Sequence, residues 1–255
     1  MLSLSQRYMH FIKKKIKEIL LQCNFDPYNL IDGYGFGLDE RIIEYPWLFA
    51  RLPFGDGTLL DAGSVLNFKY ILTQKSLLNK KIFISTLSPE KVSFWKRSIS
   101  YIYEDMRDIC YKDNYFDYIV SLSVIEHIGL DNTKFYTKDK LMNELNQESY
   151  LLVVDEMRRV LKENGTLYLS MPFGKNKNYG WLQTFNSDMI DAIIETFSPV
   201  SYKEYHYKYT NNGWITSTRE MSADCNYYDY HNNKITYIRG YPIAAEAIVC
   251  LEMKK

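Results

Sequence analysis

Residues 58–67 read TLLDAGSVLN. An apolar segment that ends in Asp-Ala-Gly-Ser predicts a buried β-strand followed by a tight turn and a helix. In Rossmann-like folds a glycine at this turn lets the backbone approach a bound nucleotide, because a side chain there would collide with the ligand. The stretch has one glycine where dinucleotide-binding proteins have G-x-G-x-x-G. Taken alone, it therefore fits a plain strand-helix turn as well as a nucleotide site.

Short apolar segments alternate with longer amphipathic ones around this stretch, which is typical of a parallel sheet with crossover helices. A loop and a short helix are expected within residues 31–52, and the polar, tyrosine-rich segment 213–240 is expected to be a loop over a site. We expect helices over residues 4–22, 151–161 and 187–196, and seven strands over residues 58–61, 81–85, 99–103, 116–122, 165–171, 202–209 and 245–252.

The composition indicates one globular domain over residues 1–255. Hydrophobic residues make up 46% and charged residues 24%, which is enough for a substantial core. Lysine plus arginine and aspartate plus glutamate both number 31, so no basic excess points to a nucleic-acid partner. Frequent lysine, isoleucine, asparagine and tyrosine are typical of an AT-rich bacterial genome. The 23 tyrosines are also consistent with an aromatic surface that forms a homo-oligomer.

Cysteine spacing and the N-terminal sequence favour a cytoplasmic protein. Cys23, Cys110, Cys225 and Cys250 form no C-x-x-C pair and have no neighbouring histidines, so we expect buried, reduced thiols and no zinc site. The first residues lack the apolar run of a signal peptide, and no segment is apolar enough for membrane insertion.

Two further motifs follow the first in a characteristic order. Residues 116–128 read FDYIVSLSVIEHI, and residues 158–172 read RRVLKENGTLYLSMP; before them, YEDMRD closes the third expected strand. Together with the glycine-bearing strand end, this order resembles the class I S-adenosylmethionine-dependent methyltransferases over about residues 55–172. The resemblance implies a Rossmann-like α/β fold, with a seven-stranded, mostly parallel sheet and helices on both faces. It also implies S-adenosylmethionine as cofactor and S-adenosylhomocysteine as product.

On this resemblance the chain divides into an N-terminal helix and lid segment (1–54), a cofactor-binding core (55–172) and an acceptor-binding part with the last strands (173–255). In the core, the resemblance implies that Asp105 accepts a hydrogen bond from the adenine amino group while Met106 packs on the ring. The other implied cofactor residues are Asp61, Ala62, Gly63, Ser64 and Asn67 after the first strand, and Ser121, Leu122 and Ser123 at the end of the fourth.

The sequence departs from the family pattern at two places. The second and third glycines after the first strand are replaced, and the second strand, IFISTLSPE, lacks the acidic residue that usually holds the ribose. Thr86 could supply a hydroxyl there, or Glu90 could reach back. A degenerate nucleotide-binding scaffold without catalysis is therefore an alternative to an enzyme, and a nicotinamide-dependent oxidoreductase is less favoured because G-x-G-x-x-G is absent.

A narrower likeness concerns the acceptor. ARLPFGDGTLLDAGS, CYKDNYFDYIVSLSVIEHIGLDN and GTLYLSMPFG resemble methyltransferases found among bacterial capsule and surface-polysaccharide genes. This implies O-methylation of a sugar or nucleotide-linked sugar, with N-methylation of a small metabolite as the alternative. If the acceptor is a nucleotide sugar, Arg219 could meet its phosphate.

Methyl transfer to an alcohol needs a base that removes the hydroxyl proton. His127 follows the fourth strand directly and is the first candidate, with Asp131 to orient it or to meet a sugar hydroxyl; a purely structural Glu126-His127 pair is equally consistent with the motif. No complete metal-ligand set is visible, so no metal is expected. Tyr45 and Trp47 either fold over the cofactor or, more simply, staple the N-terminal helix to the sheet. The residues expected to contact the acceptor are Phe173, Lys175, Trp181 and Gln183.

Overall fold

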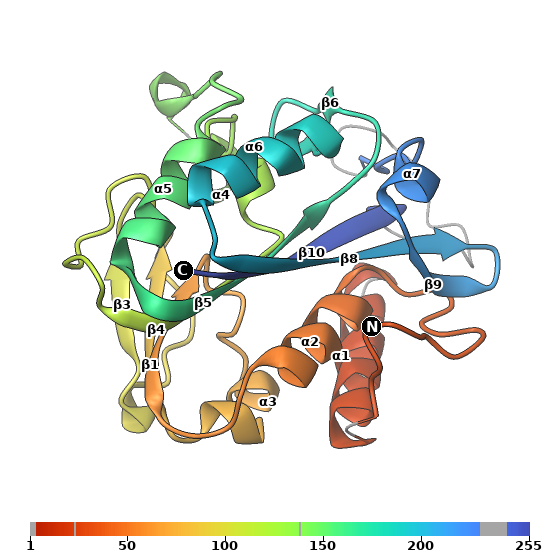
Figure 1. Cartoon of the computed structure of the whole chain (residues 1–255), viewed down its shortest axis with the longest axis horizontal. Coiled ribbons are helices and arrows are strands. Elements are labelled where there is room, and N and C mark those ends of the chain that lie inside the picture. The colour runs from red at the N-terminus through yellow and green to blue at the C-terminus, as the bar shows by residue number, and fades with distance from the viewer. Residues whose placement is uncertain (1–3, 23, 138, 230–243) are drawn as a thin grey trace.

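The computed structural model describes residues 4–22, 24–137, 139–229 and 244–255 (Figure 1). Its centre is a twisted eight-stranded sheet with the order β3-β2-β1-β4-β5-β10-β8-β9. The first five of these strands are parallel to their neighbours, whereas β10 is antiparallel to both β5 and β8, and β9 is antiparallel to β8. The strands are β1 (Gly57–Ala62), β2 (Lys80–Thr86), β3 (Ser100–Tyr103), β4 (Phe116–Leu122), β5 (Leu161–Pro172), β8 (Ser201–Thr210), β9 (Gly213–Ser217) and β10 (Ala247–Lys254).

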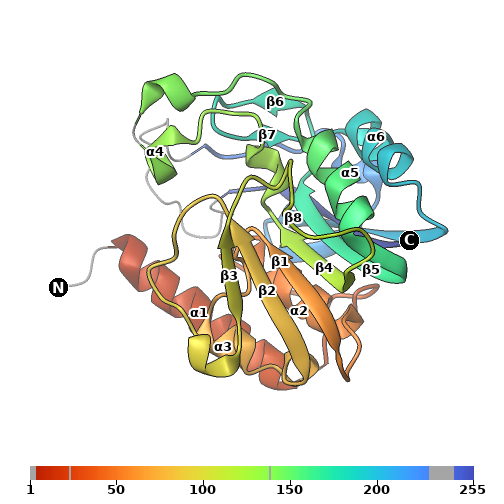
Figure 2. The same ribbon diagram turned by 90° about the vertical axis from the view of Figure 1, so that its left-hand side faces the viewer.

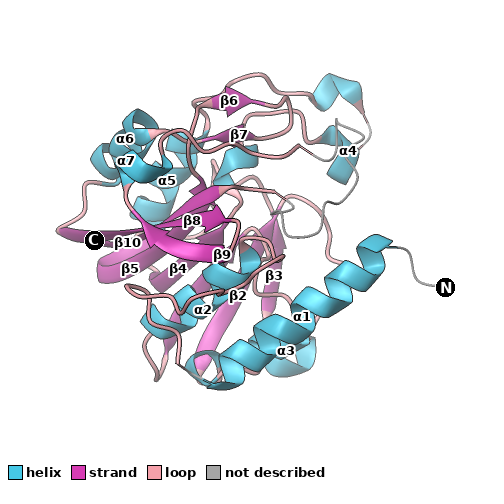
Figure 3. Ribbon diagram, turned by 90° about the vertical axis from the view of Figure 1, so that its right-hand side faces the viewer, coloured by secondary structure: helices cyan, strands magenta, loops and turns pink. Residues whose placement is uncertain are grey.

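Helices cover both faces of the sheet. On one face lie α1 (Leu4–Gln22), α2 (Arg41–Arg51) and the short α3 (Lys69–Leu72), and on the other lie α5 (Tyr150–Val160) and α6 (Ser187–Phe197) (Figure 1). The short helix α4 (Thr133–Tyr136) and the two-stranded ribbon β6 (Lys177–Asn178) and β7 (Gln183–Thr184) lie together at one end of the sheet (Figures 2 and 3). This is the end at which the parallel strands β4 and β5 finish. The helix α7 (Arg219–Ser222) follows β9.

The central strands are apolar because they are covered on both sides. In β1, Leu59 packs with the α1–α2 side of the core and Leu60 with the α5–α6 side, and both are fully buried. In β4, Ile119 and Val120 divide between the two sides in the same way. This alternation is the pleat of a strand buried on both faces, and it explains why the first and fourth strands appear in the sequence as continuous apolar runs.

The N-terminal helices attach to the sheet through large side chains. Trp47 of α2 has no exposed surface and packs edge-on against Tyr168 and Tyr205, with ring centroids 6.0 and 5.9 Å away. Tyr45 donates a hydrogen bond to the carbonyl oxygen of Val65 at 2.6 Å. The Tyr45-Pro-Trp motif therefore fastens α2 to the sheet.

Two expectations for the fold were wrong. The sheet has eight strands rather than seven, because β9 and α7 lie in the segment expected to be a loop; residues 230–240 of that segment fall outside the described part of the chain. The edge strand β9 pairs with β8, and its Trp214 is fully buried with Nε1 donating to the carbonyl oxygen of Leu38. The helix expected directly after the first strand is only the four-residue α3. A turn that is bonded to Asp61 occupies the intervening residues.

Cys225 and Cys250 are buried free thiols, as expected, whereas the free thiol of Cys110 is exposed, so the expectation of a buried thiol was wrong there; Cys23 lies outside the described residues. Among the helices that the structure describes, none combines the length and the apolar character needed to cross a membrane.

Candidate active site

The turn after β1 is built around a buried carboxylate. Asp61 has no exposed surface, and its two oxygens accept the backbone N–H groups of Val65 at 2.9 Å and Leu66 at 2.8 Å. Gly63 has a φ of +114°, and a Cβ there would lie 2.4 Å from Cγ2 of Val124. The glycine is therefore required by the close approach of this turn to the end of β4. Asp61 shapes the turn, and the turn presents Gly63 and Ser64 at the strand end.

Three serine hydroxyls near this edge have no hydrogen-bond partner among the described residues. They are Ser64 after β1, Ser85 in β2 and Ser121 in β4, and all three are buried. Buried hydroxyls are normally paired, so orphaned ones on three adjacent strands indicate a missing polar partner. A ligand that carries hydroxyl, amino and carboxylate groups would satisfy them. Ser85 was missed in the sequence, where the expected hydroxyl was that of its half-exposed neighbour Thr86.

The other residues expected at the cofactor form hydrogen bonds with other residues of the chain or are buried. Asn67 donates through Nδ2 to the carbonyl oxygen of Val92 and accepts the hydroxyl of Tyr101 through Oδ1. Ala62 and Leu122 have no exposed surface, and Met106 is 7% exposed.

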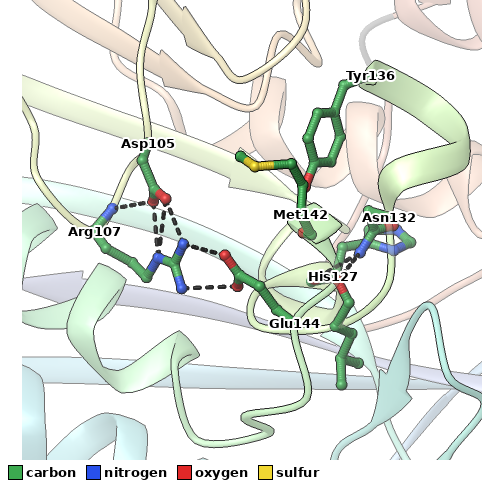
Figure 4. A network of polar contacts seen from close by, with 8 residues as sticks. Asp105, Arg107, His127, Asn132, Tyr136, Met142 and Glu144 are labelled. Atoms are coloured by element: carbon green, nitrogen blue, oxygen red, sulfur yellow. Dashed lines mark hydrogen bonds and ion pairs between the residues drawn. The ribbon is translucent and has the colours of Figure 1, made fainter. Parts of the chain in front are cut away.

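Asp105, which follows β3, and His127 (Figure 4) line a small pocket to which Met106 also contributes. The Asp105 carboxylate pairs with Arg107, which also pairs with Glu144. Partial burial opposes ionisation of Asp105, but the hydrogen bonds from Arg107 outweigh it and lower the pKa of the carboxyl below its usual range. Asp105 is therefore an ionised hydrogen-bond acceptor.

Glu44 of α2 ties the N-terminal part of the chain to the strand ends. It is fully buried, and its Oε1 accepts the hydroxyls of Ser123 at 2.5 Å and Ser170 at 2.6 Å. Its Oε2 accepts Nη1 of Arg41 at 2.8 Å, and the same nitrogen donates to the carbonyl oxygen of Leu122. The Ser123 hydroxyl therefore donates its hydrogen bond to Glu44 and not to a ligand.

Two carboxyl groups beside this network each have an oxygen without a partner in the described structure. They are Glu40, directly before α2, and Glu126, which is only 3% exposed. Burial, reinforced by the nearby charges of Asp39 and Glu44, raises the pKa of Glu40 to about 8. Burial likewise raises the pKa of Glu126 well above its usual value. Burial and the charges of Glu40 and Glu126 raise the pKa of Tyr227.

The convergence of Glu40, Glu126 and Tyr227 was not expected from the sequence. The one signal in the sequence was Glu126 itself, an acidic residue among the apolar residues of the motif at 116–128. The raised pKa values favour the protonated carboxyls, which can both donate and accept hydrogen bonds.

His127 ends one turn of 3-10 helix, Ile125–His127. Its Nδ1 lies 3.0 Å from the carbonyl oxygen of Trp181. Because a carbonyl oxygen only accepts, Nδ1 carries the proton of the neutral ring and Nε2 carries the lone pair. The rings of His127 and Trp181 lie at an angle of 31°, with centroids 5.1 Å apart. Asp131 accepts the backbone N–H and the hydroxyl of Thr133 through Oδ1, and the backbone carbonyl of Trp181 contacts His127.

The residues expected at the acceptor fall into two groups. Trp181 lies against His127, and its Nε1 donates to Asp229 at 3.2 Å. Gln183 is fully buried, with Nε2 bonded to the carbonyl oxygen of Gln147 and Oε1 unpartnered in the described structure.

Phe173 and Lys175 follow β5 in the chain. Phe173 is a core residue, 1% exposed, that packs edge-on against His206. Lys175 is on the surface, 3.7 Å from Asp224.

Arg219 is bonded to Glu204 and Asp191 and so serves a structural ion-pair network. A group of three side chains able to hold a metal ion is not found within the described ranges.

The buried carboxyls predict a stability that falls as the pH rises. The pKa values of Asp61 and Glu40 are raised, mainly by burial, to about 7 and about 8, whereas carboxyls in the unfolded chain ionise near pH 4. Between about pH 5 and 8 the native state therefore binds more protons than the unfolded state, and the free energy of unfolding decreases with pH. We expect a lower urea midpoint at about pH 8.5 than at about pH 6. Glu40→Gln should flatten this dependence, and a midpoint that rises across the interval would contradict the assignment.

Several known proteins are similar to this chain in sequence or in fold. Residues 62–169 match a family model described as a methyltransferase domain. Among solved structures, the chain is similar to 1,6-didemethyltoxoflavin-N1-methyltransferase of Burkholderia thailandensis, with a TM-score of 0.50 and 12% identity, covering 83% of this chain and 76% of that one. It is also similar to the YcgJ protein of Bacillus subtilis, with a TM-score of 0.49 and 12% identity, covering 83% and 98%.

A third similar structure, phosphoethanolamine N-methyltransferase 2 of Haemonchus contortus, has a TM-score of 0.44 and 17% identity, covering 63% of this chain and 37% of that one. No curated protein matches the chain. The likeness to the Burkholderia thailandensis enzyme shows a shared fold. Residues 62–169 are therefore a methyltransferase domain of the S-adenosylmethionine-dependent type, set in a Rossmann-like, mostly parallel sheet flanked by helices.

Proposed function

We propose that this enzyme, acting in the cytoplasm, transfers a methyl group to a hydroxyl of a sugar or nucleotide-linked sugar during capsule or surface-polysaccharide assembly. One observation carries the proposal: the His127 ring, whose Nδ1 donates to the backbone of Trp181, lies against the Trp181 ring, and it follows directly in the chain on Glu126, a buried carboxyl with one oxygen that has no partner among the described residues. Polar groups beside buried aromatic rings fix the orientation of a ligand's hydroxyls.

The residues present fit the cofactor. The orphaned hydroxyls of Ser64, Ser85 and Ser121 would meet its polar groups, and Asp105 with Met106 would hold the adenine. S-adenosylmethionine supplies a methyl group on a sulfonium, which is already a good leaving group. The protein therefore has to place the acceptor oxygen behind the methyl group and remove the hydroxyl proton.

His127 would take that proton through Nε2. The hydrogen bond from Nδ1 to the backbone of Trp181 holds the ring in the required tautomer. Burial raises the pKa of Glu40 to about 8 and that of Glu126 well above its usual value, which favours neutral carboxyls that can donate to an uncharged hydroxyl as well as accept from it.

N-methylation of a small amine is the second candidate. The observation in its favour is the same pair of carboxyls, because a cationic amine would bring them into the ionised state and pair with them. An amine acceptor would therefore bind with release of protons, whereas a sugar would not.

Calorimetric titration with S-adenosylmethionine and S-adenosylhomocysteine, with NAD as control, tests the cofactor. We expect both sulfur compounds to bind and NAD to fail. Asp105→Ala should weaken binding by about tenfold or more, because a hydrogen bond to an ionised group is lost. Unchanged affinity in Asp105→Ala would remove this residue from the site, and binding of neither sulfur compound would favour the degenerate scaffold.

A screen of nucleotide sugars and small amines, with S-adenosylhomocysteine release as the readout, then separates the two classes of acceptor.

A further inference from the structure

Arg107 connects two segments that meet beside Asp105. Its backbone N–H and Nε donate to Oδ1 of Asp105 at 2.9 and 3.0 Å, and Nη2 donates to Oδ2 at 2.5 Å (Figure 4). On its other side, Nη1 and Nη2 donate to the two oxygens of Glu144 at 2.8 and 2.6 Å. Asp105 follows β3, whereas Glu144 belongs to the segment between α4 and α5. One guanidinium thus clamps both segments in a forked geometry.

The hydrogen-bond count leaves Asp105 one free acceptor direction. A carboxylate offers about four lone-pair directions. Three N–H groups of Arg107 occupy three of these directions: the backbone N–H, Nη2 and Nε take one each, and Nε, at 3.0 Å from Oδ1, also lies 3.1 Å from Oδ2. Asp105 is still 39% exposed and lines the pocket that Met106 and Tyr136 also line. Its orientation is therefore fixed by Arg107, while one acceptor direction remains for a ligand.

Glu144 fixes the position of the Arg107 guanidinium through two hydrogen bonds. Without it, the guanidinium would have Asp105 as its one carboxylate partner among the described residues and could rotate with it. Both ion pairs are partly exposed, with side-chain exposures of 25% for Arg107 and 34% for Glu144. They therefore contribute geometry more than stability.

We propose that Arg107 and Glu144 are positioning residues that direct the Asp105 carboxylate at the exocyclic amine of adenine, and so select a 6-amino purine over a 6-oxo purine. The proposal rests on the proposed binding of S-adenosylmethionine. A 6-amino group donates to the carboxylate, whereas a 6-oxo group presents a second acceptor and is repelled. The difference in affinity between the two purines is larger when the carboxylate is held rigidly, because a mobile carboxylate can turn away from the 6-oxo oxygen.

The test compares the affinities of S-adenosylhomocysteine and its 6-oxo analogue, S-inosylhomocysteine, by calorimetry. Wild type should prefer the adenine compound strongly. Glu144→Ala should bind S-adenosylhomocysteine about fivefold more weakly and lose a larger part of the preference, and Glu144→Gln, which keeps one acceptor oxygen, should lie between the two. Glu148→Ala is the matched control, because Glu148 is exposed in the same segment; it should behave as wild type. Thermal unfolding checks that each variant is folded.

The preference for adenine is the decisive readout, because a merely structural role of Glu144 would lower both affinities together. An unchanged preference ratio in Glu144→Ala, in a protein where Asp105→Ala abolishes the preference, would overturn the inference and leave the proposed function intact. Failure of wild type to bind S-adenosylhomocysteine at all would overturn the proposed function, and this inference with it.

Discussion

Replacing Glu44 with alanine is expected to lower the free energy of unfolding by about 3 to 5 kcal/mol, the cost of removing one member of a buried ionic network. The carboxylate is fully buried and is the shared acceptor for Ser123, Ser170 and Arg41. Its loss leaves two hydroxyls unpaired and a guanidinium held by the carbonyl oxygen of Leu122. It also cuts the polar connection between α2 and the ends of β4 and β5.

Urea denaturation near neutral pH measures this effect, with the slope of the transition compared between variants. Glu44→Gln keeps two polar atoms in place and should lose less stability than Glu44→Ala. Glu18→Ala on the exposed side of α1 is the matched control and should leave the midpoint unchanged, because its pairs with Lys14 and Lys15 are on the surface. A Glu44→Ala midpoint equal to that of the control would show that α2 is held by its apolar side chains alone.

The central sheet could be predicted from the sequence because each of its strands is encoded locally. The expected strand 116–122 coincides with β4, and 58–61 lies inside β1. Strands buried on both faces are apolar runs between turn residues, and this signal needs no knowledge of the rest of the chain. The edge strand β9 has no such run. Its place depends on Trp214 packing under the loop that contains Leu38, a contact between residues far apart in the sequence.

The residues of the candidate site also fall into two groups. Some can be predicted from their local sequence, and others depend on contacts between distant segments. His127 and Trp181 each follow a strand end, so their proximity follows from the meeting of parallel strands at one edge of the sheet. Glu40, Glu44 and Tyr227 come from segments outside the motifs and reach the site through tertiary packing. Phe173 was expected at the acceptor but continues the β5 edge as a core residue, bridged to Phe185. No local pattern distinguishes these cases.

The largest expected effect on activity is that of His127→Ala. Removing a general base typically lowers the rate by about a hundredfold to ten-thousandfold. The structure supports this role because the Nδ1 contact with Trp181 leaves the lone pair on Nε2. We therefore expect kcat for an alcohol acceptor found by the screen to fall by this factor. Affinity for S-adenosylhomocysteine should change little, since the variant removes an interaction used mainly in the transition state.

A structural role for His127 would also lower activity, and a second substitution separates the two explanations. The amide nitrogen of His127→Asn can replace Nδ1 as donor to the carbonyl oxygen of Trp181, but asparagine has no counterpart to the basic Nε2. If His127 is the base, the asparagine and alanine variants should be equally slow. If its role is to anchor residue 181, asparagine should restore turnover. His10→Ala, on the exposed part of α1, should match wild type in both assays.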